Sequence, residues 1–327
     1  MKKLLKALTA IFIILFLLGA PVWLVFKYEA VYDWWRLRGY TPPAEIVALA
    51  DHVGMTPLAR HDLYINRPQL IPDSNNFRKN CPNAEQTIVL GCYLAGEGGI
   101  YVYKVQDQRL KGILEVTAAH ETLHGAYERL SSKDKHYING LLQDYYQHGL
   151  SDQRIKDSMA AYKKTEPDAL VDEMHSVFGT EAGNLPAALE SYYQRYFANR
   201  AVIVGLANQY EREFSSRIAQ INAYDEQLTG LKKQIDATEQ NLKQRLAEIS
   251  AERARLDSLL ASDQKDAYNQ SVPSFNNSIE TYNRDVRALQ AQIASYNQLV
   301  ESRNSLAKDL RSLQASIDTR LSPQPAQ

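Results

Sequence analysis

The sequence predicts an α+β protein with an N-terminal transmembrane helix, a small domain of a short β-sheet plus helices, and a C-terminal antiparallel coiled-coil hairpin. Three observations predict this class. Residues 7–26 are almost entirely apolar, residues 42–198 mix β-branched runs with helical patterns, and residues 199–320 carry a seven-residue apolar repeat. We expect residues 28–41 to be a juxtamembrane linker and residues 321–327 to be a disordered tail.

The first 27 residues have the features of a cytoplasmic tip and a signal anchor. The apolar run of residues 7–26 is long enough to cross the roughly 30 Å hydrocarbon core as a helix. Three lysines precede it, which favours a cytoplasmic N-terminus. A cleaved signal peptide is the alternative, but the run is longer than a usual signal-peptide core, and Pro21 would lie beside the scissile bond. We expect a single-pass cell-membrane protein with the bulk of the chain outside the cytoplasm, in a bacterial envelope or a secretory-pathway membrane.

Aromatic residues follow the apolar run directly. Tyr28, Tyr32, Trp34 and Trp35 lie where the aromatic belt of a membrane protein is expected. The lipid bilayer is therefore an expected partner of the N-terminal segment.

The two cysteines agree with an extracytoplasmic location. Cys81 and Cys92 bracket a short loop and lack the Cys-x-x-Cys spacing of a metal site. In an oxidising compartment we expect them to form a disulfide, which would stabilise the fold by about 3 kcal/mol. Two unpaired thiols are the alternative.

A β-hairpin is expected before the central helix of the domain. Residues 87–94 and 100–105 are rich in β-branched and aromatic side chains, and a glycine-rich segment at residues 96–99 separates them. A shorter run, residues 63–65, also has strand character.

The most informative motif is His120-Glu121-Thr122-Leu123-His124, inside a run with helical character. An α-helix advances about 100° per residue, so His120 and His124 lie one above the other on a single face. Two imidazoles can then reach one ion, while Glu121 is rotated away from the coordinating direction but close enough to hold a water molecule. The alternative is a chance match in a chain with seven histidines.

This motif resembles that of the zincin metallopeptidases. The resemblance implies that His120 and His124 bind one Zn²⁺ ion and that Glu121 is the general base for a zinc-activated water. It covers about a dozen residues closely and the surrounding domain only loosely. The resemblance also implies a small sheet before the metal helix, with an edge strand that hydrogen-bonds an extended substrate peptide, and we hypothesise that the expected hairpin is that sheet.

A zinc site in a peptidase needs a third protein ligand. No histidine follows His124 at the spacing of the metzincin subgroup, so the gluzincin pattern, with a glutamate on a later helix, fits better. Residues 168–178 are predicted to form that helix, with Glu173 at the margin of its apolar face. Glu173 is the favoured third ligand, and Glu181 and His175 are the alternatives. The family's usual second-shell aspartate is replaced by Val177 here. Glu181 or Asp172 is expected to fill that role.

The C-terminal third has the periodicity of a coiled coil. The apolar residues at every seventh position are Ile221, Leu228, Ile235, Leu242, Ile249 and Leu256. A second apolar series follows an interruption at residues 269–273, which contains Pro273. The interruption favours an antiparallel helical hairpin, and a parallel dimer is the alternative.

Two functions fit this organisation. The first is a membrane-anchored zinc endopeptidase that hydrolyses peptide or protein substrates. The second is an envelope scaffold whose coiled coil binds a protein partner or a second copy, with a structural or inactive metal domain. The formal net charge of −1 gives no electrostatic reason to expect nucleic-acid binding.

Overall fold

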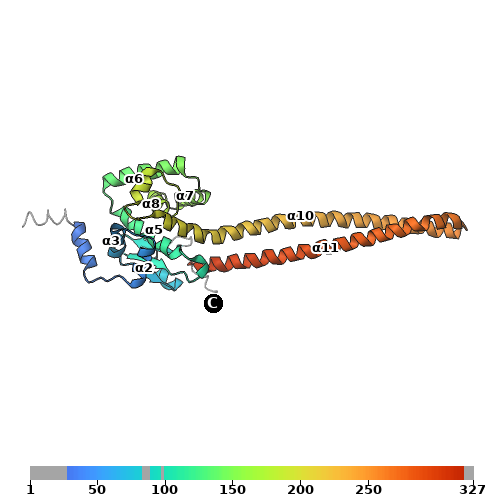
Figure 1. Cartoon of the computed structure of the whole chain (residues 1–327), viewed down its shortest axis with the longest axis horizontal. Helices are drawn as coiled ribbons and strands as arrows, with labels where there is room; N and C mark the ends of the chain where they lie inside the picture. The colour runs from blue at the N-terminus through green and yellow to red at the C-terminus, as the bar shows by residue number, and fades with distance from the viewer. Residues whose placement is uncertain (1–27, 83–88, 97–98, 320–327) are drawn as a thin grey trace, which may run out of the picture. The chain divides into compact units, whose positions relative to one another are not determined.

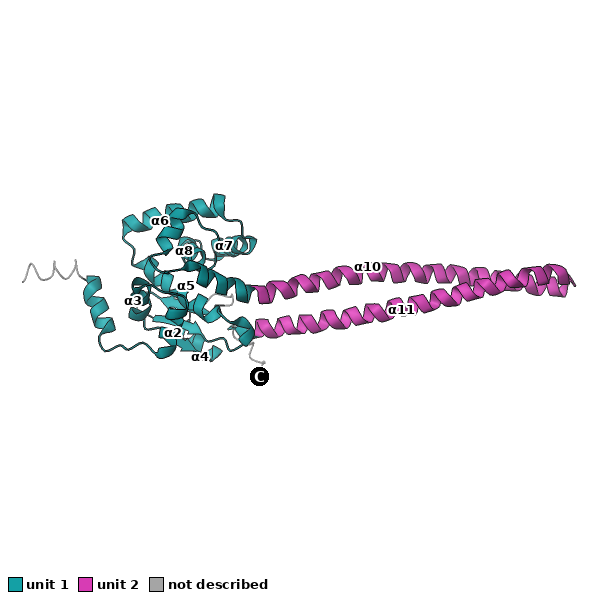
Figure 2. Cartoon of the chain, viewed as in Figure 1, with its two compact units in different colours: residues 1–211, 316–327 teal, residues 212–315 magenta. Residues whose placement is uncertain are grey.

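The computed structural model describes residues 28–82, 89–96 and 99–319. The chain divides into two compact units, one of residues 1–211 with 316–327 and the other of residues 212–315 (Figure 2). The predicted membrane anchor, residues 7–26, and the predicted tail, residues 321–327, lie outside the described residues. Within the described part of the chain, no helix combines the length and the apolar character that a membrane span requires.

The described chain is mostly helical, with one small sheet (Figure 1). The elements of the first unit are α2 (Ala44–His52), α3 (Pro57–Ile65), β1 (Gln69–Ile71), α4 (Ser74–Asn80), β2 (Gly91–Leu94), β3 (Gly99–Tyr103), η1 (Gln108–Leu110), α5 (Ile113–Glu128), α6 (Ser132–Asp144), the π-helical turn η2 (Tyr145–Gly149), α7 (Gln153–Thr165), α8 (Leu170–Thr180) and α9 (Ala187–Tyr193). The long helices α10 (Arg200–Ala261) and α11 (Lys265–Ile317) follow. Residues 28–37, within the predicted linker, are also helical.

The sheet has three strands in the order β1-β3-β2. β2 and β3 pair antiparallel, with Cys92 opposite Tyr101, which confirms the predicted hairpin. β1 pairs with β3 in parallel. β2 is therefore an edge strand among the described residues. β2 also contacts the central helix α5, and its residues line the pocket described below.

The prediction of a strand at residues 63–65 is wrong. These residues form the last turn of α3, which begins with Pro57 after the capping side chain of Thr56. Ala59 and Leu63, four residues apart, are both buried on one face of that helix. A run of three residues with strand character is too short to outweigh this helical spacing and its cap.

α5 is the central helix of the first unit. It contacts α8, α3 and α2, and it also packs against β2 and β3. Its buried side chains are small or apolar, including Val116, Ala119 and Leu123. Small residues allow the neighbouring elements to approach α5 closely, so its histidines are held in a packed environment.

The predicted disulfide is present. Cys81 is the C-terminal cap of α4 and Cys92 lies in β2, and their sulfur atoms are bonded with the Cα atoms 6.1 Å apart. The disulfide therefore ties the edge strand to the neighbouring helix.

Reduction of this disulfide is expected to lower the free energy of unfolding by about 3 kcal/mol, because the unfolded chain regains the entropy of an open loop. Thermal unfolding with and without reductant measures the change. The Cys81→Ala/Cys92→Ala variant is the control, since reductant has nothing further to break in it. Equal stability of the oxidised and reduced chains would contradict the prediction.

The second unit is a pair of antiparallel helices, α10 and α11. As residue numbers rise along α10, those of the partners on α11 fall. The pairs are Arg217 with Asp309 at 2.6 Å, Asp225 with Arg303 at 2.9 Å, Thr238 with Gln292 at 3.3 Å and Arg255 with Ser271 at 2.8 Å. Ile235, Leu242 and Leu256 of the predicted repeat are buried. The helices thus pair within one chain, as the hairpin prediction expected.

The turn between the two helices is not where the sequence placed it. The helix break lies at residues 262–264, where Asp263 has a positive φ of 56°. Pro273 lies inside α11. Proline removes one backbone hydrogen bond and can bend a helix without ending it, whereas aspartate is one of the few residues that adopt the left-handed conformation readily.

Candidate metal centre

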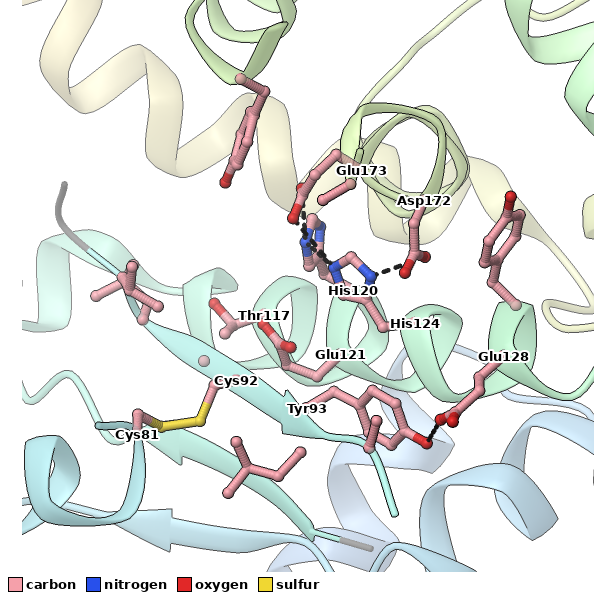
Figure 3. Close-up of a pocket in the computed structure, with 18 of the residues that line it drawn as sticks. Cys81, Cys92, Tyr93, Thr117, His120, Glu121, His124, Glu128, Asp172 and Glu173 are labelled. Carbon is pink, nitrogen blue, oxygen red and sulfur yellow. Dashed lines mark hydrogen bonds and ion pairs between the residues drawn. A yellow bond between two sulfur atoms is a disulfide. The ribbon is translucent and has the colours of Figure 1, made fainter. Parts of the chain in front are cut away.

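The two motif histidines face the same way from α5. His120 and His124 lie one turn apart, and their Nε2 atoms are 3.1 Å apart (Figure 3). Both side chains are largely buried, with 18% of His120 and 13% of His124 exposed. Two imidazole nitrogens that approach this closely need a shared proton or a shared cation between them.

Glu173 on α8 completes a group of three ligands. Its Oε2 lies 3.6 Å from His120 Nε2, and its Oε1 lies 3.5 Å from His124 Nε2. A tetrahedral ion with ligands at about 2.0–2.1 Å separates its ligand atoms by about 3.3 Å. One ligand atom from each of the three residues lies within 4.8 Å of the other two, so the three side chains could hold one ion. In the described part of the chain they form the one group of three or more His, Cys, Asp or Glu side chains close enough to hold a metal ion.

The other two candidates for the third ligand are engaged elsewhere. Glu181 pairs with Arg154 at 2.6 Å. His175 is fully buried, and its Nε2 lies 2.9 Å from the hydroxyl of Tyr192. Burial lowers the pKa of His175 to about 3, so this imidazole is a neutral member of the aromatic core.

Asp172 of α8 holds the imidazole of His124 in place through a hydrogen bond. Nδ1 of His124 donates a hydrogen bond to Asp172 Oδ1 at 2.9 Å (Figure 3). A carboxylate that fixes a proton on Nδ1 leaves the lone pair of Nε2 free to bind a cation, as carboxylates behind metal-binding histidines usually do. Of the two carboxylates expected in this role, Asp172 contacts a candidate ligand and Glu181 pairs with Arg154.

The Asp172→Asn variant is expected to bind the metal about 10–100-fold more weakly, since an amide neither fixes the tautomer nor raises the basicity of His124 as a carboxylate does. Metal titration in the presence of a competing chelator measures the change. Asp157→Asn on α7 is the matched control, because Asp157 accepts a hydrogen bond from Gln153 and lies outside the pocket. Equal affinities in the wild type and Asp172→Asn would remove the supporting role of Asp172.

The neighbouring groups shift the pKa values of the two histidines in opposite directions. Burial, followed by the neighbouring His124 and His175, lowers the pKa of His120. At His124, burial favours the neutral form, but the hydrogen bond and the charge of Asp172 outweigh it and raise the pKa to about 9. A divalent cation at Nε2 would compete with the proton that His124 otherwise carries.

Glu121 is buried against the edge strand. It is 6% exposed, lines the same pocket as the three ligands, and accepts a hydrogen bond from the backbone of Tyr93. Burial is the main cause that raises its pKa to about 8, and the neighbouring Glu173 and Asp172 add to the effect. A cation held nearby would lower this pKa and favour the carboxylate.

Gly91 makes room for Glu121. A Cβ atom at Gly91 would lie 2.6 Å from Glu121 Oε1 and 2.7 Å from both Glu121 Cγ and Thr117 Cγ2. Thr117 is β-branched, and its hydroxyl donates a hydrogen bond to the carbonyl of Ile113. Its side chain therefore cannot rotate away freely. Glu121 can therefore occupy its position only because residue 91 has no side chain.

We expect Gly91→Ala to reduce the activity of the site about 100-fold while the three metal ligands stay in place, because a displacement of about 1 Å in a reacting group has that cost. Gly140→Ala is the matched control, since a Cβ there has no neighbour within 4 Å. Activity and metal content are measured on both variants. Wild-type activity in Gly91→Ala would show that Glu121 tolerates the shift.

Two hydrogen bonds near the site were not predicted from the sequence. Thr319, near the end of the described chain, donates a hydrogen bond to the carbonyl of Val89 at 2.7 Å, just before β2. The hydroxyl of Tyr93 donates to Glu128 of α5 (Figure 3). The Tyr93 contact joins β2 to α5, and the Thr319 contact joins the segment before β2 to the segment after α11. The partners are 230 and 35 residues apart in the sequence, so no local sequence pattern predicts these contacts.

The pocket runs along β2 and across α5 to α8. Its lining includes Gly91, Cys92 and Tyr93 of β2, and Tyr162 and Glu166 at the end of α7. The three candidate ligands and Glu121 line the same pocket. The pocket is therefore a groove beside an edge strand, with a candidate metal site and a buried carboxylate in it. A comparison with protein-family models, characterised proteins and solved structures finds no match for this chain.

Proposed function

We propose that the chain is a membrane-anchored, extracytoplasmic zinc metallopeptidase. One observation carries the proposal: His120, His124 and Glu173 converge within coordinating distance in the same pocket as Glu121. Two histidines and a carboxylate form a donor set that zinc accepts in catalytic sites, with one position left open.

His120, His124 and Glu173 would hold the ion. When bound, zinc polarises a peptide carbonyl and makes water a nucleophile near neutral pH. Glu121 would take the proton of the attacking water and later return it to the leaving amine. Asp172 would keep His124 in the tautomer that exposes Nε2.

The edge strand offers a way to hold a peptide. β2 pairs with β3 on one side, and its residues line the groove on the other. An extended substrate can hydrogen-bond to such an edge through its backbone, so that its scissile bond lies near the buried carboxylate. This arrangement favours unfolded or flexible protein segments as substrates.

The test is cleavage of a quenched-fluorescence peptide mixture by the purified full-length chain. We expect cleavage to stop when a chelator removes the metal and to return when zinc is added back. Cleavage that survives complete removal of metal would contradict the proposal.

The cell-membrane location is part of the proposal and rests on the sequence of residues 7–26 and its flanking lysines. The disulfide between Cys81 and Cys92 supports an oxidising compartment for the folded domain. Fusion of a periplasmic or cytoplasmic reporter to the C-terminus in bacteria tests the topology. Activity of the cytoplasmic reporter alone would contradict it.

An envelope scaffold is the second candidate. It is favoured by apolar side chains that the paired helices leave exposed, with Leu246 at 49%, Leu260 at 48% and Ile218 at 45%. Such residues on a long hairpin can bind a protein partner or a second copy of the chain. Peptide cleavage with a full zinc complement favours the enzyme, and a metal-free chain that still forms a specific complex through α10 and α11 favours the scaffold.

A further inference from the structure

The helix at residues 28–37 exposes large aromatic side chains on one face. Tyr28, Trp34 and Trp35 are 66%, 60% and 61% exposed, and Val31 is 39% exposed. At about 100° per residue, these four residues occupy one third of the helix circumference. An exposed group of this kind marks an interaction surface more often than a solvated one.

The other face of the same helix is fixed to the folded unit. Arg129 donates hydrogen bonds of 3.0 and 2.7 Å to the two carboxylate oxygens of Asp33. Nε of Arg36 donates to the carbonyl of Ile65 at 2.8 Å, and Arg67 donates to the carbonyl of Arg36 at 2.8 Å. Asp33 and Arg36 are each only 9% exposed. A bidentate Arg–carboxylate pair of low exposure holds its elements in a defined orientation.

Arg129 also connects this helix to the candidate metal centre. It is the C-terminal cap of α5, the helix that carries His120 and His124. Its ion pair with Asp33 therefore joins the aromatic helix to the end of the metal-binding helix. The orientation of the aromatic helix therefore restricts the orientation of α5.

The chemistry of the exposed face matches a bilayer interface. Tryptophan and tyrosine have an apolar body and a polar tip, and they concentrate at the headgroup level of membranes. The guanidinium of Arg38 lies 5.2 Å from the centre of the Trp34 ring, where it can reach toward phosphates while its stem covers apolar surface. The sequence immediately before this helix is the 20-residue apolar run of residues 7–26.

We propose that residues 28–38 form an interfacial helix that lies in the headgroup region of the bilayer and holds the metal-binding unit against the membrane surface in one orientation. The proposal rests on the membrane location proposed above and does not require peptidase activity. Tyr28, Val31, Trp34 and Trp35 contact lipid, and Asp33 and Arg36 contact the folded unit. Residues 28–41 are thus a docked element and not a flexible spacer.

The tryptophan positions make a direct experiment feasible. The chain has three tryptophans, at positions 23, 34 and 35, so Trp23→Phe leaves only the pair on the exposed face. This variant of the full-length chain is reconstituted in liposomes of phosphatidylcholine and phosphatidylglycerol. Tryptophan emission is quenched with lipids brominated near the headgroup end of the acyl chain, with lipids brominated near the bilayer centre, or with aqueous acrylamide.

We expect strong quenching by the shallow bromines, at least 3-fold weaker quenching by the deep bromines, and weak quenching by acrylamide. Strong acrylamide quenching without lipid quenching would overturn the interfacial placement, and stronger quenching by the deep bromines would overturn it as well. Liposome flotation separates this failure from that of the anchor, because a chain that does not float has no membrane location at all.

A second measurement tests the fixed orientation. Hydrogen exchange of residues 28–37 in the reconstituted chain is compared with that of Asp33→Asn and of Trp34→Ser/Trp35→Ser. We expect Asp33→Asn to accelerate exchange in this helix at least 10-fold, because its contact with Arg129 is weakened. The serine variant keeps that contact and serves as the control for lipid burial. Equal exchange in the wild type and Asp33→Asn would overturn docking to the folded unit.

Discussion

Glu121→Gln is expected to retain the metal and to cleave peptides about 10²–10⁴-fold more slowly than the wild type, which is the range for loss of a general acid–base group. Glutamine has the same shape as glutamate, so the buried position beside Gly91 remains filled. It cannot accept the proton of an attacking water. His120, His124 and Glu173 are unchanged, so the metal site persists.

The measurement pairs a peptide-cleavage assay with the metal content of the same sample. Glu115→Gln is the matched control, because Glu115 lies on the same helix but bonds to His52 and does not line the pocket. Loss of both metal and activity in Glu121→Gln would indicate a structural role. Unchanged cleavage would remove Glu121 as the base.

Glu173→Ala is expected to weaken metal binding by at least about 100-fold, because loss of a ligand exceeds the 10–100-fold cost typical of a second-shell change. His120 and His124 then remain without the carboxylate that completes the group of three. Glu181→Ala is the matched control, since Glu181 lines the same pocket but pairs with Arg154. We expect the control to bind the metal as the wild type does.

Competition with a fluorescent zinc chelator measures both affinities. The opposite result, loss of the metal in Glu181→Ala and retention in Glu173→Ala, would assign the third ligand to Glu181. Retention in both variants would mean that neither carboxylate is needed, and the tetrahedral interpretation would then be wrong.

The parts of the site that the sequence predicted are those set by local geometry. Helical periodicity alone brings His120 and His124 to one face, and the margin of an apolar helix face pointed to Glu173. The choice between Asp172 and Glu181 as the supporting carboxylate was open, because it depends on how α8 is rotated against α5. Packing between helices decides that rotation, and a single sequence does not encode it in any local pattern.

The features that escaped prediction depend on contacts between distant segments. No local pattern in the sequence marks Gly91, whose role is to leave space for the Glu121 side chain of a different element. The ion pair of Asp33 with Arg129 turns an expected linker into a docked helix. At residues 63–65 the helical cap and spacing outweigh local strand propensity. At Pro273 the proline lies inside α11, and the chain turns at residues 262–264 instead.

The most direct test of the account is the zinc content of the full-length chain, purified in detergent, loaded with zinc and dialysed, and compared with His120→Ala/His124→Ala. The account predicts one tightly bound zinc ion per wild-type chain and none in the variant, with both proteins folded by circular dichroism. A wild-type chain that retains no stoichiometric zinc, or a variant that retains as much as the wild type, would contradict it.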